Sequence, residues 1–252
     1  MLEVRNIETY YGPIRAIAGI SLDIPENGMI CILGANGSGK STILKTIAGV
    51  LEPDKGRVIF FRKSITGLSP DRIAQLGISL VPEGREIFPD LTVRECLDLG
   101  AYKRRDKAGI QKDVNLCMDY FSVLKERRSQ LAGMLSGGEQ QMLVVAMALV
   151  AKPKLLMVDE PSLGLSPIVN VQLFQIFKNI NKNEKTALLI VEQNAKAVLS
   201  IAEYGYVMEN GRIVLEGPSE KLAKHPDVRE FYLGLKNEGV RGTKRWKRRK
   251  HW

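Results

Sequence analysis

Long apolar runs are absent from this chain of 252 residues. The longest candidate, residues 142–151, has about half of the ~18 residues that a membrane-spanning helix needs. The first residues, MLEVRNIETYYG, contain no basic segment followed by an apolar one, so we expect no secretory signal. Both absences argue against a membrane-spanning or secreted protein, and they favour the cytosol.

Cysteine and histidine are also scarce. The three cysteines, Cys31, Cys96 and Cys117, are odd in number, lack C-x-x-C spacing and lie among apolar residues. We interpret them as reduced core thiols, which this pattern fits better than a disulfide or metal framework. The two histidines, His225 and His251, both lie far down the chain.

Excess charge is missing from most of the chain, although the formal net charge is +9. Residues 241–252, RGTKRWKRRKHW, hold seven basic residues and no acid, and without them 30 basic residues stand against 28 acidic ones. We expect a basic tail at 237–252, disordered by self-repulsion. It could contact anionic lipid, bind RNA with Trp246 and Trp252 stacking on bases, or serve only as a solubilising tail.

The remaining pattern predicts an α/β fold. Apolar runs of strand length alternate with amphipathic stretches of helical period, which is typical of a largely parallel sheet. The candidate strands are residues 29–33, 78–81, 155–158 and 187–191, with a hairpin of residues 204–208 and 212–215 that turns at Asn210-Gly211.

Residues 89–151 have a different pattern and are predicted to be helical throughout. Their apolar residues recur at spacings of four, three, four and three, as on one face of a helix. The repeating positions are Ile110, Val114, Cys117, Phe121 and Leu124. We therefore expect an all-helical insertion within the α/β core.

The octapeptide GANGSGKS, residues 34–41, follows an apolar strand and precedes a helix, so it matches the phosphate-binding loop G-x-x-x-x-G-K-[ST] in the expected context. Glycines allow the backbone to approach phosphates, and the helix start adds partial positive charge. Lys40 is predicted to reach the β- and γ-phosphates, and Ser41 to bind Mg²⁺. The predicted nucleotide-binding residues here are Gly34, Asn36, Gly37, Ser38, Gly39, Lys40, Ser41 and Thr42.

Two adjacent carboxylates end the buried run LLMVDEP, residues 155–161. In phosphoryl transfer, one acid at a strand end holds the Mg²⁺ shell and another group orients or activates the attacking water. We assign the first role to Asp159 and the second, the general base, to Glu160. Together with the phosphate loop, this pair predicts a site of nucleotide hydrolysis.

The segment LSGGEQQ, residues 135–141, precedes the apolar stretch MLVVAMALV and resembles the signature motif of ATP-binding-cassette (ABC) ATPases. It would form a second anion-binding helix start. In that family the two helix ends face one nucleotide only across a dimer. The resemblance therefore implies that Ser136, Gly137 and Gly138 complete the ATP site of a second subunit.

The resemblance covers residues 1–236, and it implies an ABC-type nucleotide-binding domain of the P-loop NTPases. Such a domain has a RecA-like core, an antiparallel β portion and a helical subdomain, here inserted at about residues 89–151. The resemblance matches Tyr11 to the aromatic that stacks on adenine, although it could be an ordinary surface tyrosine. It matches SLGLS, residues 162–166, to the loop that communicates between the two sites.

The stretch GREIFPDLT, residues 84–92, matches the family's lever toward the membrane partner. Ile87 and Phe88 suit a docking surface there, or they fill a local core.

Two residues depart from the usual family pattern. Glu83 replaces a glutamine, and it could bind Mg²⁺ directly or through water, or pair with Arg85. Gln193, in VEQN, replaces a histidine.

Gln193 can donate a hydrogen bond to a γ-phosphate oxygen but cannot take a proton, so Glu160 remains the candidate base. With EPSLGLSP, the two departures resemble the LivF-type ATPase of branched-chain amino acid importers and its relatives for amides and urea. That implies an ATP- and Mg²⁺-dependent ATPase subunit at the cytoplasmic face of the membrane. Its partners would be integral-membrane permease subunits and a second ATP-binding subunit, which is either another copy of this chain or a sister ATPase. An extracytoplasmic solute-binding protein would be an indirect partner.

Two other functions remain open from the sequence. A soluble ABC ATPase acting on nucleic acid or ribosomes would account for the basic tail, although such proteins tend to fuse two cassettes or insert long coiled coils. The ATPase of a lipid or lipopolysaccharide exporter is also a single cassette. VPEG and VEQN favour the importer branch by resemblance alone.

Overall fold

Six strands form the central sheet of the computed structural model, which describes residues 1–232. They are β3 (Met29–Gly34), β6 (Ile78–Val81), β7 (Leu155–Asp159), β8 (Ala187–Glu192), β9 (Tyr204–Glu209) and β10 (Arg212–Pro218). Their order is β10-β9-β3-β8-β7-β6, and every neighbouring pair is parallel except β9 with β10. The strands predicted from apolar runs are confirmed, as is the hairpin turn at Asn210-Gly211.

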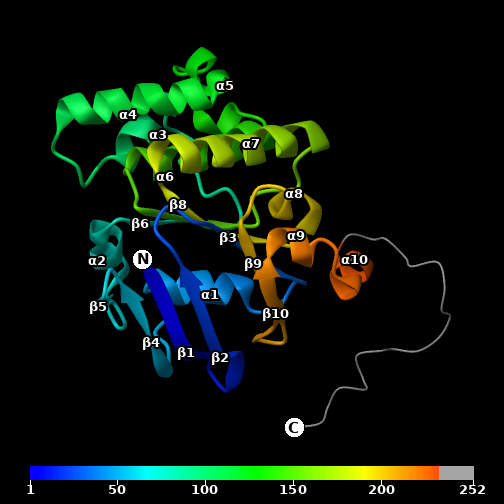
Figure 1. Ribbon diagram of the computed structural model, residues 1–252. Helices are drawn as coiled ribbons and strands as arrows, with labels where there is room; N and C mark the ends of the chain where they lie inside the picture. Colours follow the sequence, from blue (N-terminus) through cyan, green and yellow to red (C-terminus); the bar gives the residue numbers. More distant parts are fainter. Residues whose placement is uncertain (233–252) are drawn as a thin grey trace, which may run out of the picture.

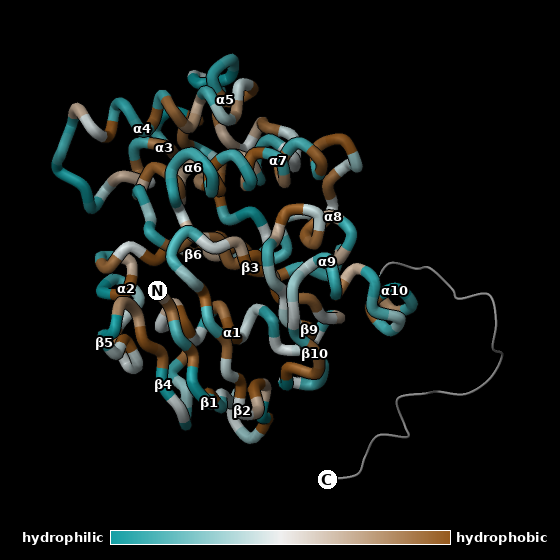
Figure 2. The backbone as a smooth tube through the Cα atoms, in the orientation of Figure 1, coloured by the Kyte–Doolittle hydropathy of each residue, from teal (hydrophilic) through white to brown (hydrophobic). Residues whose placement is uncertain are grey.

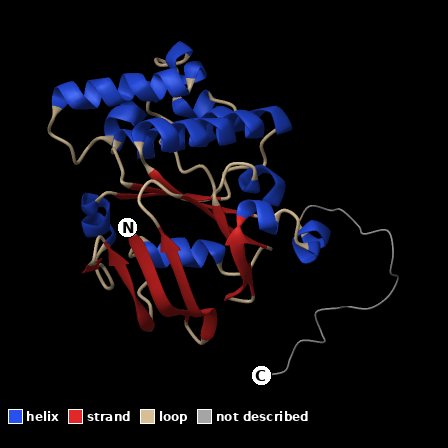
Figure 3. Ribbon diagram, viewed as in Figure 1, coloured by secondary structure: helices blue, strands red, loops and turns tan. Residues whose placement is uncertain are grey.

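A second, antiparallel sheet packs beside the first (Figure 3). Its strands are β1 (Leu2–Tyr11), β2 (Ile14–Ile24), β4 (Lys55–Phe60) and β5 (Lys63–Ser64), in the order β2-β1-β4-β5. Buried and exposed residues alternate along β2, so one face meets the core and the other meets solvent. These strands were not predicted from the residue pattern, because the prediction used continuous apolar runs. The antiparallel β portion that the family resemblance implied is present.

Helices joined by loops make up most of the segment between β6 and β7, so the prediction that residues 89–151 are helical throughout is wrong at residues 101–106 and 127–131. The helices are α3 (Val93–Gly100), α4 (Lys107–Tyr120), α5 (Ser122–Glu126), the 3₁₀ helix η1 (Ala132–Met134) and α6 (Gly137–Val150). The only pairing of β type in this segment is an isolated bridge between Thr92 and Leu131. The helical periodicity predicted for this segment is confirmed, since Val114, Cys117 and Phe121 are buried.

The other helices flank the central sheet on both sides (Figure 1). They are α1 (Lys40–Ile47), α2 (Pro70–Leu76), α7 (Pro167–Glu184), α8 (Ala195–Leu199), α9 (Ser219–Leu222) and α10 (Pro226–Phe231). Figure 1 places α7 with α3, α4 and α6 on one side of the sheet, and α1 with the antiparallel sheet on the other. The basic tail predicted at 237–252 lies outside the described residues.

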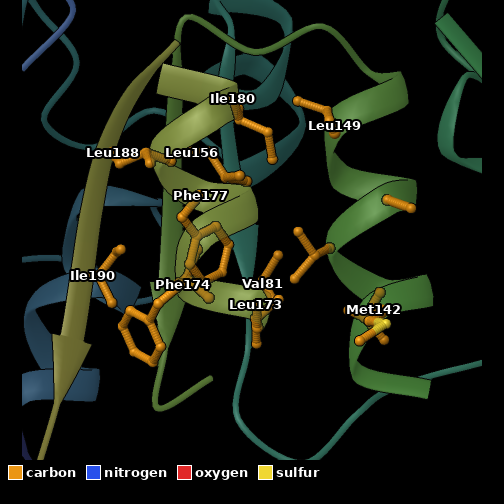
Figure 4. Packing of buried hydrophobic residues seen from close by; sticks show 14 of the residues in the cluster. Val81, Met142, Leu149, Leu156, Leu173, Phe174, Phe177, Ile180, Leu188 and Ile190 are labelled. Carbon is orange, nitrogen blue, oxygen red and sulfur yellow. The ribbon is translucent and has the colours of Figure 1, made fainter. Parts of the chain in front are cut away.

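The central sheet separates two hydrophobic cores, seen as apolar segments on both sides of it in Figure 2. In β3, Cys31 and Leu33 join the core on the helical side, whereas Ile30 and Ile32 join the core around α1. Alternate side chains of a strand point to opposite faces of the sheet. A strand that is covered on both faces therefore has a continuous run of apolar residues in its sequence. Figure 4 shows Phe177 of α7 packed on the helical side.

The three cysteines are buried and free, as predicted. Burial raises the pKa of the Cys31 thiol to about 12, so this sulfur stays protonated at neutral pH. Within residues 1–232, no helix is both long and apolar enough to cross a bilayer.

Candidate nucleotide-binding site

The predicted phosphate-binding loop, residues 34–41, connects β3 to α1 at the carboxyl end of β3. Gly39 has a φ of 103°, and a Cβ atom there would lie 2.9 Å from the carbonyl oxygen of Ala16. A Cβ atom on Gly34 would lie 2.3 Å from Oγ of Ser38. A side chain at either glycine would therefore collide with a neighbour, so both positions require glycine.

Lys40 curls back over this loop. Its Nζ donates hydrogen bonds to the carbonyl oxygens of Gly34 at 2.9 Å and Ala35 at 3.0 Å. The loop tip, with Asn36 and Gly37, is exposed to solvent. The loop thus presents backbone amides and a fixed ammonium group at the start of α1, an arrangement that suits phosphate.

Ser38 and Thr42 are, like Lys40, buried polar residues of the same loop and helix. Oγ of Ser38 has no hydrogen-bond partner among the described residues. Thr42 lies in the first turn of α1, where its carbonyl oxygen accepts a hydrogen bond from the Thr46 hydroxyl. An unpaired buried hydroxyl costs free energy unless a ligand or water satisfies it, which fits a loop that wraps an anion.

Asp159 and Glu160 lie side by side where β7 ends. Oε1 of Glu160 lies 2.9 Å from Nζ of Lys40, and both side chains are almost completely buried. Glu160 has a φ of 44°, a left-handed conformation that is uncommon outside glycine. Such strained residues concentrate at functional sites, where the surrounding structure maintains them.

The ionisation of Asp159 is perturbed. Burial raises its pKa to about 6, and the charges of Glu160 and Glu83 add to this, while the Ser41 hydroxyl and the Lys40 ammonium act in the opposite direction. Its Oδ1 is buried and has no partner among the described residues. A cation beside this carboxylate would restore its charged form.

Ser41, Asp159 and Glu83 come together around a hollow of about 250 Å³. Its other lining residues are Lys45, Leu80, Pro82, Gly84 and Glu86. In the described part of the chain, no three His, Cys, Asp or Glu side chains form a metal cluster. Mg²⁺, however, is often bound through one or two carboxylates with substrate phosphates and water. The orphaned Asp159 oxygen and the neighbouring hydroxyl fit that ion.

The alternative pairing of Glu83 with Arg85 is wrong. Nη2 of Arg85 instead donates to the carbonyl oxygens of Leu163 at 2.9 Å and Gly164 at 3.3 Å. The Glu83 side chain is exposed at the rim of the hollow. It remains a candidate Mg²⁺ ligand.

Ser136 caps the start of α6. Its hydroxyl accepts from the amide of Glu139, whose carboxylate in turn accepts from the Ser136 amide at 2.8 Å. This capping box is the local reason that a helix begins at Gly137. None of the hydrogen bonds of the described residues joins Ser136, Gly137 or Gly138 to the phosphate loop.

Gln193 follows β8 and is exposed, and its carbonyl oxygen accepts from the amide of Ala195. The residue before it, Glu192, was missed by the sequence reasoning. Its buried carboxylate accepts from the amides of Ser162 at 2.9 Å and Asn194 at 3.2 Å. Burial raises its pKa. Through these two hydrogen bonds, Glu192 links the segment after Glu160 to the segment that contains Gln193.

Tyr11 ends β1 and pairs with Ile14 across the turn to β2. Its side chain is 44% exposed. Ala16, on the same β2 strand, contacts Gly39 of the phosphate loop. Tyr11 therefore has an accessible ring on a hairpin that lies against this loop, as a residue that stacks on adenine requires.

A model of the ABC transporter family matches residues 17–163, more than half of the chain. The chain belongs to the ABC transporter family. It is an ABC-type, ATP-binding ATPase, and the α/β fold class predicted from its sequence is confirmed. The structure is similar to that of a solved nucleotide-free ATP-binding cassette from an ABC transporter, with a TM-score of 0.82. The two sequences are 29% identical, and the match covers 93% of this chain and 99% of that chain.

Two relatives are similar to this ABC ATPase over nearly its whole length. The high-affinity branched-chain amino acid transport ATP-binding protein BraG of Pseudomonas aeruginosa is 42% identical, covering 93% of this chain and all of BraG. The probable branched-chain amino acid transport ATP-binding protein LivF of Archaeoglobus fulgidus is 34% identical, covering 93% of this chain and 99% of LivF. The predicted resemblance is confirmed.

Proposed function

We propose that this ABC ATPase hydrolyses ATP for a membrane importer of branched-chain or related amino acids. The observation that carries the proposal is the 42% identity with BraG along the whole of that transport subunit. The chain would act at the cytoplasmic face of the membrane, bound to permease subunits and to a second ATP-binding subunit. A solute-binding protein on the other side would deliver the amino acid.

The geometry of the loop at 34–41 supports its role in nucleotide binding. Its backbone amides and Lys40 would hold the phosphates, while Tyr11 stacks on adenine. Ser41 and Asp159 would bind Mg²⁺, with Glu83 as a further oxygen ligand. When bound, Mg²⁺ neutralises negative charge on the phosphates and orients them for attack.

Hydrolysis requires a proton acceptor beside the γ-phosphate. Glu160 would take the proton from the attacking water, and general bases of this kind contribute about 10²- to 10⁴-fold. Lys40 keeps the Glu160 carboxylate in place until phosphate oxygens compete for the ammonium. Gln193 would donate its amide hydrogen to a γ-phosphate oxygen and thus sense the nucleotide without taking a proton.

A second subunit would complete the site. Ser136 and the two glycines after it begin a helix and, among the described residues, share no hydrogen bond with the chain's own phosphate loop, so we assign them to the nucleotide of a partner. Beside them, Leu163, Ile168 and Val171 are exposed apolar residues, with Ile168 at 73%. Exposed apolar residues close to a functional helix start are suited to burial in a head-to-tail dimer.

The permease would bind near the start of the helical segment. Ile87 packs against the helical-side core, whereas Phe88 is 49% exposed. Two further exposed apolar residues, Leu131 and Met134, lie in the turn that hydrogen-bonds to residues 89 and 91 through backbone groups. An apolar surface built from two chain segments suits a helix of a membrane partner.

The test is co-purification of the full chain with permease subunits of a branched-chain amino acid importer from the same organism. ATPase activity of the complex in lipid vesicles is then measured with the solute-binding protein, with and without leucine, isoleucine or valine. The proposal predicts a complex whose ATPase activity rises with one of these solutes. A chain that does not associate with the permease, or one stimulated by RNA alone, would contradict it. Deleting residues 241–252 and measuring RNA and lipid retention tests the tail.

A further inference from the structure

Arg85 contacts two loops that are far from it in the sequence. Its Nη2 donates to the carbonyl oxygens of Leu163 and Gly164, across 78 and 79 residues of chain. Its guanidinium also covers Gly137, where a Cβ atom would lie 2.3 Å from Nη1 and 3.0 Å from Cζ. One half-buried side chain therefore lies between the loop at 162–166 and the start of α6.

The backbone around Arg85 is arranged for this contact. Gly84 has a φ of 100° and Arg85 a φ of 56°, so the link after β6 turns through two left-handed residues. A non-glycine residue in this region carries strain that the surrounding structure must offset. The guanidinium spans both contacts, with Nη2 on the carbonyl oxygens of the 162–166 loop and Nη1 and Cζ close to Gly137. The compact ammonium group of a lysine has no such extended plane.

No carboxylate forms a salt bridge with Arg85 in the part of the chain that the structure describes. Its recorded hydrogen bonds go to the backbone of the 162–166 loop. Gly164 in that loop has a φ of 66°, and a Cβ atom there would meet Nη2 at 3.0 Å. Arg85 thus fixes backbone positions rather than balancing a charge.

We propose that Arg85 is a positioning residue for the half of the ATP site that this chain offers to its partner. It holds the 162–166 loop and the 136–138 helix start at a fixed separation, so that both reach the partner's nucleotide together. It also belongs to the link that carries Phe88, so a shift of the permease-facing surface moves both segments. This inference rests on the head-to-tail dimer of the proposed function.

The test compares Arg85→Ala and Arg85→Lys with wild type in the full chain, and Arg128→Ala serves as a control because Arg128 is an exposed arginine of the same helical segment. Arg85→Ala should lower kcat about 10- to 100-fold, the range expected for a small displacement of a site. ATP affinity of the separate subunit should stay within about twofold, because the phosphate loop is untouched. Arg85→Lys should recover only part of kcat, and Arg128→Ala should match wild type.

A second measurement uses the Glu160→Gln background, in which dimers formed with ATP accumulate and are measured by light scattering. Arg85→Ala should weaken this dimer about tenfold. A lower Tm with unchanged kcat and unchanged dimer affinity would overturn the inference and leave Arg85 as a packing residue. An inactive, monomeric wild type would instead overturn the proposed function, so the two failures are distinguishable.

Discussion

Nζ of Lys40 and Oε1 of Glu160 lie 2.9 Å apart, with 3% and 8% of the two side chains exposed. The residue predicted to bind phosphate is therefore paired with the predicted base. A buried ion pair has a large desolvation cost, and removing one partner leaves the other uncompensated.

Lys40→Met should lower the free energy of unfolding of the nucleotide-free chain by about 3 kcal/mol, because Glu160 is left buried without its cation. Glu160→Gln in the same chain should restore much of that loss, since it removes the unpaired charge. Urea unfolding of both single variants and the double variant measures the coupling. Additive effects of the two substitutions would show that the pair does not contribute to stability in this way.

The raised pKa of Asp159 predicts that the free energy of unfolding depends on pH. Its pKa is raised from 3.8 to about 6 in the folded chain, so between these values the folded state binds more protons than the unfolded state. Stability therefore falls as the pH rises through this window, and the deficit persists above it. Asp159→Asn should raise the free energy of unfolding at pH 8 by on the order of 2 kcal/mol.

The same substitution should give a smaller gain at pH 4.5, where the wild-type carboxyl is already largely protonated in the fold. Urea unfolding at the two pH values, without nucleotide or Mg²⁺, makes the comparison. Asp54→Asn, at an exposed site, serves as the control. An equal gain at both pH values would contradict the assignment of the shift to Asp159.

Gln193→Ala should reduce kcat about tenfold, the effect of losing one hydrogen bond to a charged oxygen. Gln193→His should keep most of the activity because imidazole also donates. Steady-state ATPase rates at saturating MgATP provide the measurement. If Gln193→Ala abolished hydrolysis as fully as a change at Glu160, the separation of sensor from base would be wrong.

Glu192→Ala should lower both stability and kcat. It removes the acceptor of two partly buried amides, those of Ser162 and Asn194, at a cost of about 1 kcal/mol for each lost hydrogen bond. Glu192→Gln keeps one acceptor oxygen and should lose less. Urea unfolding and ATPase rates are measured together, with Glu203→Gln as an exposed control. An unchanged kcat in Glu192→Ala would mean that this carboxylate does not position the neighbouring loops.

The central strands and the phosphate loop could be predicted because their signals are local. A strand covered on both faces is one apolar run, and a loop that wraps phosphate needs glycine at fixed positions. The roles of Glu192 and Arg85 could not be found in this way, since the contacts that link distant loops, to Ser162 and Leu163, span 30 and 78 residues. Sequence spacing does not show which loops the fold brings together.

Glu83 illustrates the same limit. From the sequence, its neighbour Arg85 was as reasonable a partner as Mg²⁺. In the structure, Arg85 donates hydrogen bonds to the carbonyl oxygens of Leu163 and Gly164. Glu83 instead lines the hollow that Asp159 also lines. The backbone at Gly84 and Arg85 is left-handed, and that turn was not predicted from the sequence.

The most direct test of the whole account is the Glu160→Gln variant, measured for both ATP binding and ATP turnover. The amide keeps the shape of the side chain but cannot accept the proton of the attacking water, and it no longer competes with phosphate for Lys40. We predict ATP affinity equal to or higher than that of wild type, with turnover reduced by at least about 10²-fold. Turnover retained at the wild-type rate would contradict the assignment of Glu160 as the base.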